Sequence, residues 1–365
     1  MSRNTGSVAS SDTSWLKLYA AVAVLPLALA ACGGGGGGDS PSPAPAPAPT
    51  PTPPAPAPTP TPSPAPSAGV TWTNIVATSV GNLQGVDYAD SRWVAVSDSG
   101  SALTSTDGVT WTSATALSSS VGTDHLDAYA IAHSGTTFVA VGSVSSAPYT
   151  TSTGAVATST DGSTWAMGTL PTGATPIHGV IAGTKWIGLG ETGHLYSSTN
   201  GSSWSLLTTV SGPGTLNAGV YGDSKYIAVG DNGYIAASSD GTAWAAGKVI
   251  TNTGGTGINM HGVAWTGTQF VAVGDSAAIS TSPDGSMWSA LKTSAITGTL
   301  RSVAVSSGGQ IVVVGDNGIE TSTDGNTWTS RDPAGAVALN AVAFANSEFV
   351  AVGATSAIKT SVTTP

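Results

Sequence analysis

The chain has 365 residues, of which only 8% are charged, with 48 glycines and a single cysteine. One cysteine argues against a disulfide-stapled fold and against any cysteine-rich zinc or iron–sulfur site. Ten basic residues against 20 acidic residues argue against nucleic acid and anionic membrane surfaces as partners.

Residues 1–31 have the pattern of a secretory signal peptide. Arg3 and Lys17 precede an apolar run over residues 18–31, about 14 residues, whereas a membrane span takes roughly 20. The run ends in Leu-Ala-Ala-Cys at residues 29–32, which resembles the lipobox of bacterial lipoproteins. The resemblance implies cleavage before Cys32 and lipidation, including palmitate, on this cysteine. An ordinary secretory signal with an incidental cysteine is the alternative.

Residues 32–68 are predicted to be a disordered tether. Six glycines follow Cys32 directly, and 14 of the 22 prolines lie between residues 41 and 66. Alternating proline favours polyproline II, so this spacer could reach about 80 Å at roughly 3.1 Å per residue. In lipoproteins, glycine rather than aspartate after the lipidated cysteine implies an outer-membrane destination, facing either the periplasm or the cell surface.

Residues 69–365 consist of seven repeats of about 40 residues, marked by tryptophan. Seven of the 11 tryptophans mark the repeats and are separated by 39, 54, 39, 40, 44 and 40 residues. They are Trp72, Trp111, Trp165, Trp204, Trp244, Trp288 and Trp328. All except the first end a Ser-x-Asp-Gly-x-x-Trp motif, in which Asn replaces Asp once. The Asp or Asn positions are Asp107, Asp161, Asn200, Asp240, Asp284 and Asp324.

Each repeat also holds three other short runs, separated by turn residues such as the Gly-Asp-Asn-Gly at 315–318. Four short strands in a radially repeated unit make a propeller blade. We therefore predict an all-β fold, a seven-bladed β-propeller with four antiparallel strands per blade. The seventh repeat has no fourth strand after residues 358–361, whereas the Gly-Val-Thr-Trp at 69–72 repeats that at 108–111. The N-terminal strand is thus expected to supply the outer strand of the last blade and close the ring.

The motif resembles the Asp-box, or BNR repeat, of sialidase-like propellers, although its Gly follows its Asp one residue sooner than in the full Asp-box. The whole repeat is similar to the photosystem II assembly-factor-like group of bacterial and chloroplast propellers. The resemblance covers residues 69–365 and implies the propeller fold. It leaves the function open, because Asp-boxes occur in hydrolases, receptors and assembly factors alike.

Two sets of acidic residues recur once per blade. The motif Asp is expected to accept backbone N–H bonds of its own turn, and the motif Trp to pack between blades, so we interpret both as structural. A second set is expected on the opposite face, in the turn between the second and third strands. Its members are Asp98, Glu191, Asp231, Asp275 and Asp316. They are either ordinary hairpin residues or an acidic ring that attracts cations or a basic partner.

A third position varies from blade to blade, at the start of each innermost strand. Its predicted members are Gln84, Asp127, His178, Asn217, His261, Arg301 and Asn340. They are either polar residues that simply begin a strand or a binding ring around the central channel. Insertions at 143–154, which carries Pro148 and Tyr149, and at 251–259 are expected to lengthen loops on this same face. Such loops usually mark the binding side of a repeat protein.

The sequence offers little support for catalysis. Sialidase chemistry needs three converging arginines, but Arg92, Arg301 and Arg331 fall in different parts of their blades. A glycosidase needs two close carboxylates, for which Asp124 and Asp127, with Glu191 across the channel, are the candidates. The five histidines form no HxH or HExxH spacing, so no metal site or cofactor is predicted.

We therefore expect a monomeric, lipid-anchored, non-catalytic propeller of the bacterial cell envelope that binds a protein or another macromolecule. The family resemblance implies an assembly or scaffolding role. The alternative is a carbohydrate-binding or glycoside-hydrolysing propeller. A third interpretation is a purely structural surface repeat protein without a specific ligand.

Overall fold

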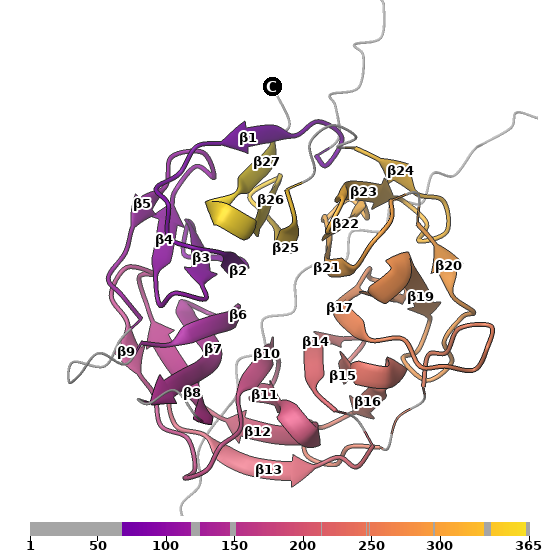
Figure 1. Cartoon of the computed structure of the whole chain (residues 1–365), viewed down its shortest axis with the longest axis horizontal. Helices are drawn as coiled ribbons and strands as arrows, with labels where there is room; N and C mark the ends of the chain where they lie inside the picture. The colour runs from indigo at the N-terminus through magenta and orange to yellow at the C-terminus, as the bar shows by residue number, and fades with distance from the viewer. Residues whose placement is uncertain are drawn as a thin grey trace, which may run out of the picture. The chain divides into compact units, whose positions relative to one another are not determined.

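A computed structural model describes residues 68–117, 125–146, 151–212, 214–245, 247, 249–294, 296–331 and 337–362. Within them, seven antiparallel sheets are arranged radially as a β-propeller, as predicted (Figure 1). The predicted signal peptide, Cys32, nearly all of the tether, Asp124, Pro148 and Tyr149 lie outside the described residues. No helix in the described part of the chain is long and apolar enough to cross a membrane.

The innermost strands surround the central channel and each pairs with a second strand. The innermost strands are β2 (Leu83–Ala89), β6 (Asp127–Ser134), β10 (Ile177–Ala182), β14 (Leu216–Gly222), β17 (Met260–Trp265), β21 (Leu300–Val305) and β25 (Leu339–Ala345). The second strands are β3 (Arg92–Ser97), β7 (Thr137–Ser146), β11 (Trp186–Gly190), β15 (Lys225–Gly230), β18 (Phe270–Gly274), β22 (Ile311–Gly315) and β26 (Glu348–Gly353).

Third and outer strands complete the blades, which are numbered 1 to 7 in the chain order of their innermost strands. The third strands are β4 (Ala102–Ser105), β8 (Thr151–Ser159), β12 (His194–Ser198), β16 (Ile235–Ser238), β19 (Ala278–Ser282), β23 (Gly318–Ser322) and β27 (Ile358–Val362). The outer strands are β5 (Thr112–Ser113), β9 (Ala166–Met167), β13 (Ser205–Thr209), β20 (Lys292–Thr293), β24 (Thr329–Ser330) and β1 (Thr73–Ile75). Four turns form short 3-10 helices, η1 (Glu191–Gly193), η2 (Asp231–Gly233), η3 (Asp275–Ala277) and η4 (Ala354–Ser356).

The second strands are apolar because they are buried on both faces. All five residues of β11, β18 and β22 are buried, which explains their Val, Ile and Gly content. The described residues form seven apolar clusters, and each cluster combines side chains of two neighbouring blades. The propeller is therefore held together by cores between its blades.

The ring closes as predicted, because β1 pairs antiparallel with β27 and the last sheet has the order β1-β27-β26-β25. This closure also rebuilds a motif turn from two distant pieces of chain. The backbone N–H of Gly69 donates to Ser361 Oγ at 2.7 Å, and Trp72 Nε1 donates to the Gly69 carbonyl at 3.0 Å. The same two bonds join Gly162 to Ser159 and Trp165 to Gly162 within one continuous motif.

In the continuous motifs, one side-chain oxygen organises the turn. Asp107 Oδ1 accepts hydrogen bonds from Ser105 Oγ at 2.9 Å and from the backbone N–H groups of Val109 and Thr110 at 2.9 and 2.6 Å. The hydrogen bond from the Thr110 backbone lowers the pKa of Asp107 to about 2, aided by the bonds from Val109 and Ser105 and opposed by a small loss of hydration. Asn200 makes the equivalent three bonds without a charge. The geometry therefore needs an acceptor at this position, and the charge is dispensable.

Two blades differ in detail from the expected pattern. The residues at the two ends of the predicted loop insertion, 143–146 and 151–154, instead extend the hairpin of β7 and β8, whose pairing continues to Ser146 and Thr151. Val144, Thr151 and Thr153 in these two segments are β-branched, which favours strands. In blade 4 the outer strand is represented by two isolated bridges, Ala237 to Ala245 and Tyr234 to Val249.

Candidate functional site

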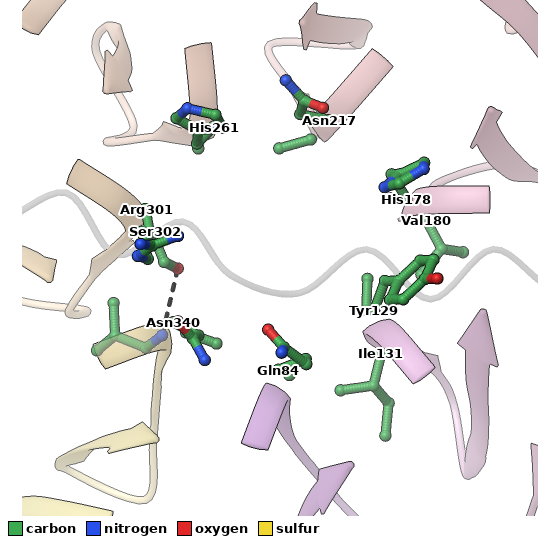
Figure 2. A pocket seen from close by; sticks show the side chains of 18 of the residues that line it. Gln84, Tyr129, Ile131, His178, Val180, Asn217, His261, Arg301, Ser302 and Asn340 are labelled. Atoms are coloured by element: carbon green, nitrogen blue, oxygen red, sulfur yellow. Dashed lines mark hydrogen bonds between the residues drawn. The ribbon is translucent and has the colours of Figure 1, made fainter. Parts of the chain in front are cut away.

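Seven side chains surround the opening of the central channel, one from each innermost strand, and we call them the mouth ring. They line a cavity of about 270 Å3 (Figure 2). Its members are Gln84, Tyr129, His178, Asn217, His261, Arg301 and Asn340. Six of them were predicted from the sequence, and the structure brings these six together.

Each mouth-ring residue lies at a β-bulge. In blade 1, Leu83 pairs with Ser97 and Gly85 pairs with Val96, so Gln84 has no partner in the ladder. The same register shift occurs in all seven innermost strands at the mouth-ring position. Because a bulge redirects the side chain of the extra residue, this shift places one side chain per blade at the opening.

The predicted member for blade 2, Asp127, is wrong, because the bulge falls at Tyr129. Ala128 pairs with Gly142 and Ala130 with Val141, which makes Ala128 the equivalent of Leu83 in blade 1. Asp127 follows Leu126, which lies two residues before Ala128, the true equivalent of Leu83. The small and β-branched pair Ala130-Ile131 matches Gly85-Val86 and could have identified Tyr129 from the sequence.

Asp127 remains on the same face but pairs with His125, at 3.0 Å. Burial raises the pKa of the Asp127 carboxyl, His125 opposes this, and the negative charge of Asp98 raises the pKa further. Asp98 and Asp127 are thus close enough to repel each other.

The acidic residues of the turns between second and third strands hold the mouth ring in place, and we call them the turn acids. Gln84 Nε2 donates to Asp98 Oδ2 at 3.1 Å, and Asn217 Nδ2 donates to Asp231 Oδ1 at 3.1 Å. Arg301 donates through Nε and a terminal nitrogen to Asp316 Oδ1, at 3.1 and 2.6 Å. The two sets that sequence reasoning treated separately are therefore partners.

Both ring histidines make the same kind of contact. His178 Nε2 lies 3.2 Å from Glu191 Oε1, and His261 Nε2 lies 2.9 Å from Asp275 Oδ1. Burial favours a higher pKa for Asp275, but the hydrogen bond and charge of His261, with hydrogen bonds from Thr299 and Asn259, bring it below the ordinary value. Asp275 is therefore an ionised acceptor at neutral pH.

Blades 2 and 7 lack the hydrogen bond between a mouth-ring residue and a turn acid, and they make other contacts instead. In blade 2, Tyr129 hydroxyl lies 2.8 Å from Ser143 Oγ, and Ser143 occupies the place of the turn acid. In blade 7, Asn340 Nδ2 donates to the Leu83 carbonyl of blade 1 at 2.9 Å. The Tyr129 ring also stacks on His178, with centroids 4.9 Å apart and planes inclined by 19°. Contacts between blades therefore restrict the ring as well.

Directly below the ring, the channel is lined by small and apolar side chains. The next residue of each innermost strand is Gly, Ala or Ser, and the one after it is Val, Ile or Gly. A Cβ added at Gly179 would lie 2.9 Å from the carbonyl oxygen of Asn217 on the neighbouring strand. Small residues are thus needed where adjacent strands approach each other.

The remaining candidates do not assemble into an active site with the ring. Arg92 donates to Ser163 Oγ in a motif turn on the opposite face, and Arg331 donates to Thr321 Oγ1 beside β24. Only Arg301 of the three arginines reaches the mouth ring. Among the described residues, no group of three or more His, Cys, Asp or Glu side chains could hold a metal ion.

Comparison with models of protein families gives no match, and comparison with curated proteins gives none either. Similar solved structures include YCF48 from Cyanidioschyzon merolae, with 16% identity, a TM-score of 0.59 and coverage of 80% of this chain and 98% of that chain. YCF48 bound to D1 peptide has 16% identity, a TM-score of 0.63 and coverage of 82% and 100%. Virginiamycin B lyase from Staphylococcus aureus has 11% identity, a TM-score of 0.63 and coverage of 80% and 97%. At these identities the similarity establishes the propeller fold.

Proposed function

We propose that this chain is a non-catalytic scaffold that binds a peptide segment of a protein partner at the mouth ring. The observation that carries the proposal is the convergence of seven side chains on one cavity, each placed there by a bulge. The identity of these side chains varies between blades whose frameworks repeat. Variation at one position of a repeated scaffold is what selective recognition needs. The structure of YCF48 bound to D1 peptide supports peptide binding as a use of this fold.

We propose no catalysis because the acidic side chains near the mouth ring are already paired with other side chains. Glu191 accepts from His178, Asp127 pairs with His125, and Asp275 accepts from His261, Thr299 and Asn259. A general acid or nucleophile needs a carboxylate directed at the substrate, whereas these carboxylates position neighbouring side chains. The Tyr129–His178 stack beside Glu191 favours a sugar ring as the alternative ligand, because aromatic faces pack against sugars.

A photo-crosslinking amino acid at position 84 tests the proposal. Gln84 lies in the mouth ring, whereas Asp90 is exposed in the turn at the other end of the same hairpin and serves as the matched control. In cells that express the full chain, irradiation is expected to yield a discrete protein adduct from position 84 and none from position 90. Equal adducts from both positions would contradict the proposal. An adduct resistant to protease and sensitive to periodate would establish the glycan alternative.

We also propose that the chain is an outer-membrane lipoprotein anchored through Cys32, because the only cysteine stands at the lipobox position. Metabolic labelling with an alkynyl fatty acid is expected to mark the wild-type chain. The Cys32→Ala variant should lose the label and leave the membrane fraction. Membrane association that persists in Cys32→Ala would rule out this anchor, and a Thr52→Ala variant in the same N-terminal region serves as the control.

A further inference from the structure

The amide donors of the mouth ring are already committed to acceptors. A carboxylate can only accept hydrogen bonds, so the amide nitrogens of Gln84 and Asn217 must face Asp98 and Asp231. The Asn340 nitrogen likewise faces the carbonyl of Leu83. In the described part of the chain, none of these three amides has a donor bonded to its side-chain oxygen. These oxygens remain as acceptors for a ligand.

The hydrogen bonds of the two ring histidines likewise determine which ring nitrogen donates and which is left to accept. Because Glu191 and Asp275 accept, the Nε2 atoms of His178 and His261 must carry the shared hydrogens. In the neutral ring, Nδ1 is then the acceptor nitrogen. Neither Nδ1 atom has a hydrogen-bond partner within the described ranges, so both add to the acceptors available at the mouth.

The charge around the ring is predominantly negative. Five turn acids lie behind the ring, against one guanidinium, and that guanidinium is held by two bonds to Asp316. Asp127 adds a sixth carboxyl on the same face, and the negative charge of Asp98 in the neighbouring blade is one of the causes that raise its pKa. The ring therefore combines open acceptors with excess negative charge.

These features favour an organic cation over a metal ion. The turn acids are distributed one per blade, and the described residues contain no group of three metal-ligating side chains. A metal ion needs several ligands at one point, whereas a peptide carries donors spaced along its length. Guanidinium and ammonium groups have donors only, which complements acceptors spread around a ring.

We infer that the mouth ring binds a basic peptide segment, in which arginine or lysine side chains donate to ring acceptors in the field of the turn acids. This inference rests on the proposed function, which it deepens by naming the chemistry of the partner. The small and apolar side chains below the ring give a charged group few hydrogen-bond partners, which favours a position for the cationic groups at the mouth.

Three labelled nonapeptides test the inference by fluorescence anisotropy with the full chain. They share a Gly-Ser background and carry three Arg, three Gln or three Glu residues at identical positions. The Arg peptide is expected to bind at least about tenfold more tightly than the Gln peptide, the equivalent of one charge-assisted hydrogen bond. The Glu peptide is expected to bind more weakly than either.

Two matched variants locate the binding. Glu191→Gln removes one negative charge but keeps an acceptor for His178, whereas Asp90→Asn removes one charge from the opposite face. Binding of the Arg peptide should weaken several-fold in Glu191→Gln and stay unchanged in Asp90→Asn, with melting temperatures confirming that both variants fold. Asn340→Arg, which places a cation in the ring, should weaken binding further.

The outcomes separate this inference from the proposed function. Tighter binding of the Gln or Glu peptide, with loss in the mouth variants, would overturn the basic partner and keep peptide binding at the mouth. Equal losses in Glu191→Gln and Asp90→Asn would reduce the effect to general attraction and overturn the inference. If none of the three peptides binds while the crosslinker at position 84 captures a protein, the basic-peptide inference fails alone. If both experiments fail, the proposed function fails with it.

Discussion

Deletion of residues 69–75 is expected to lower the melting temperature of the propeller by on the order of 10 °C. The deletion removes β1, so that the edge of β27 loses its partner strand. It also removes the Trp72 ring, whose centroid lies 6.3 Å from that of the Phe349 ring. It also removes the hydrogen bond from the Gly69 backbone N–H to Ser361 Oγ. Losses of several kcal/mol follow from a buried aromatic side chain and a strand pairing, and each kcal/mol corresponds to about 2–4 °C in a chain of this size.

A graded variant and a control define this result. Trp72→Ala keeps the backbone of β1 and should lose about 2–3 kcal/mol, because Trp72 is only partly buried. A seven-residue deletion within 41–66, the predicted spacer, should leave the melting temperature unchanged. A shift below about 2 °C on deletion of 69–75 would mean that β1 contributes little to the stability of the ring.

Trp93→Ala is expected to destabilise the propeller by about 4 kcal/mol, the typical loss for a fully buried tryptophan. Trp93 of blade 1 is fully buried, and its Nε1 donates to Glu348 Oε1 of blade 7 at 2.6 Å. Glu348 is itself only 3% exposed. This hydrogen bond therefore crosses the junction between the first and last blades inside an apolar cluster.

The pH dependence of Trp93→Phe separates the hydrogen bond from the packing. Burial raises the pKa of Glu348, while Trp93 and Thr360 oppose the rise. A raised folded-state pKa means that stability falls as pH rises from the ordinary Glu value through the folded-state value. Trp93→Phe leaves the charged carboxylate with one donor fewer, a loss of roughly 1–3 kcal/mol at pH 7. The loss should shrink at pH 4, where Glu348 is protonated.

Thermal denaturation at pH 7 and pH 4 measures this difference, with Trp186→Phe as the control. Trp186 occupies the same place in blade 3, pairing with Ser198 as Trp93 pairs with Ser105. No carboxylate of the described residues accepts a hydrogen bond from the Trp186 indole. Its replacement should have a smaller effect, equal at both pH values. A Trp93→Phe effect that is also independent of pH would show that Glu348 does not depend on this donor.

The fold was accessible from the sequence because its signals repeat. The tryptophans that mark the repeats recur at intervals of about 40 residues in four of six cases, and all but the first end a Ser-x-Asp-Gly-x-x-Trp motif, so an error in one repeat is corrected by the others. The closure by β1 followed from the match between residues 69–72 and 108–111. These inferences need only local patterns and the number of repeats.

The site was less accessible because it depends on register and on pairs of distant residues. A β-bulge shifts the side-chain alternation by one residue. In blade 2, Leu126 resembles the apolar residue that precedes the ring position, but Ala128 is the residue that occupies this place. The pairing of Gln84 with Asp98 joins two positions 14 residues apart, which composition alone does not connect. Six of the seven ring positions were nevertheless found, since polar residues at the start of an apolar strand stand out.

The split turn at Gly69 and Ser361 has a consequence for the order in which the protein folds during synthesis. Its two halves are 292 positions apart in the chain. Strand β1 is therefore synthesised first and stays unpaired until β27 has been made. The other six motif turns each form from consecutive residues and can assemble as they leave the ribosome. Contacts so distant in sequence are slow to form. The ring is thus expected to close last, and until then β27 has an exposed edge.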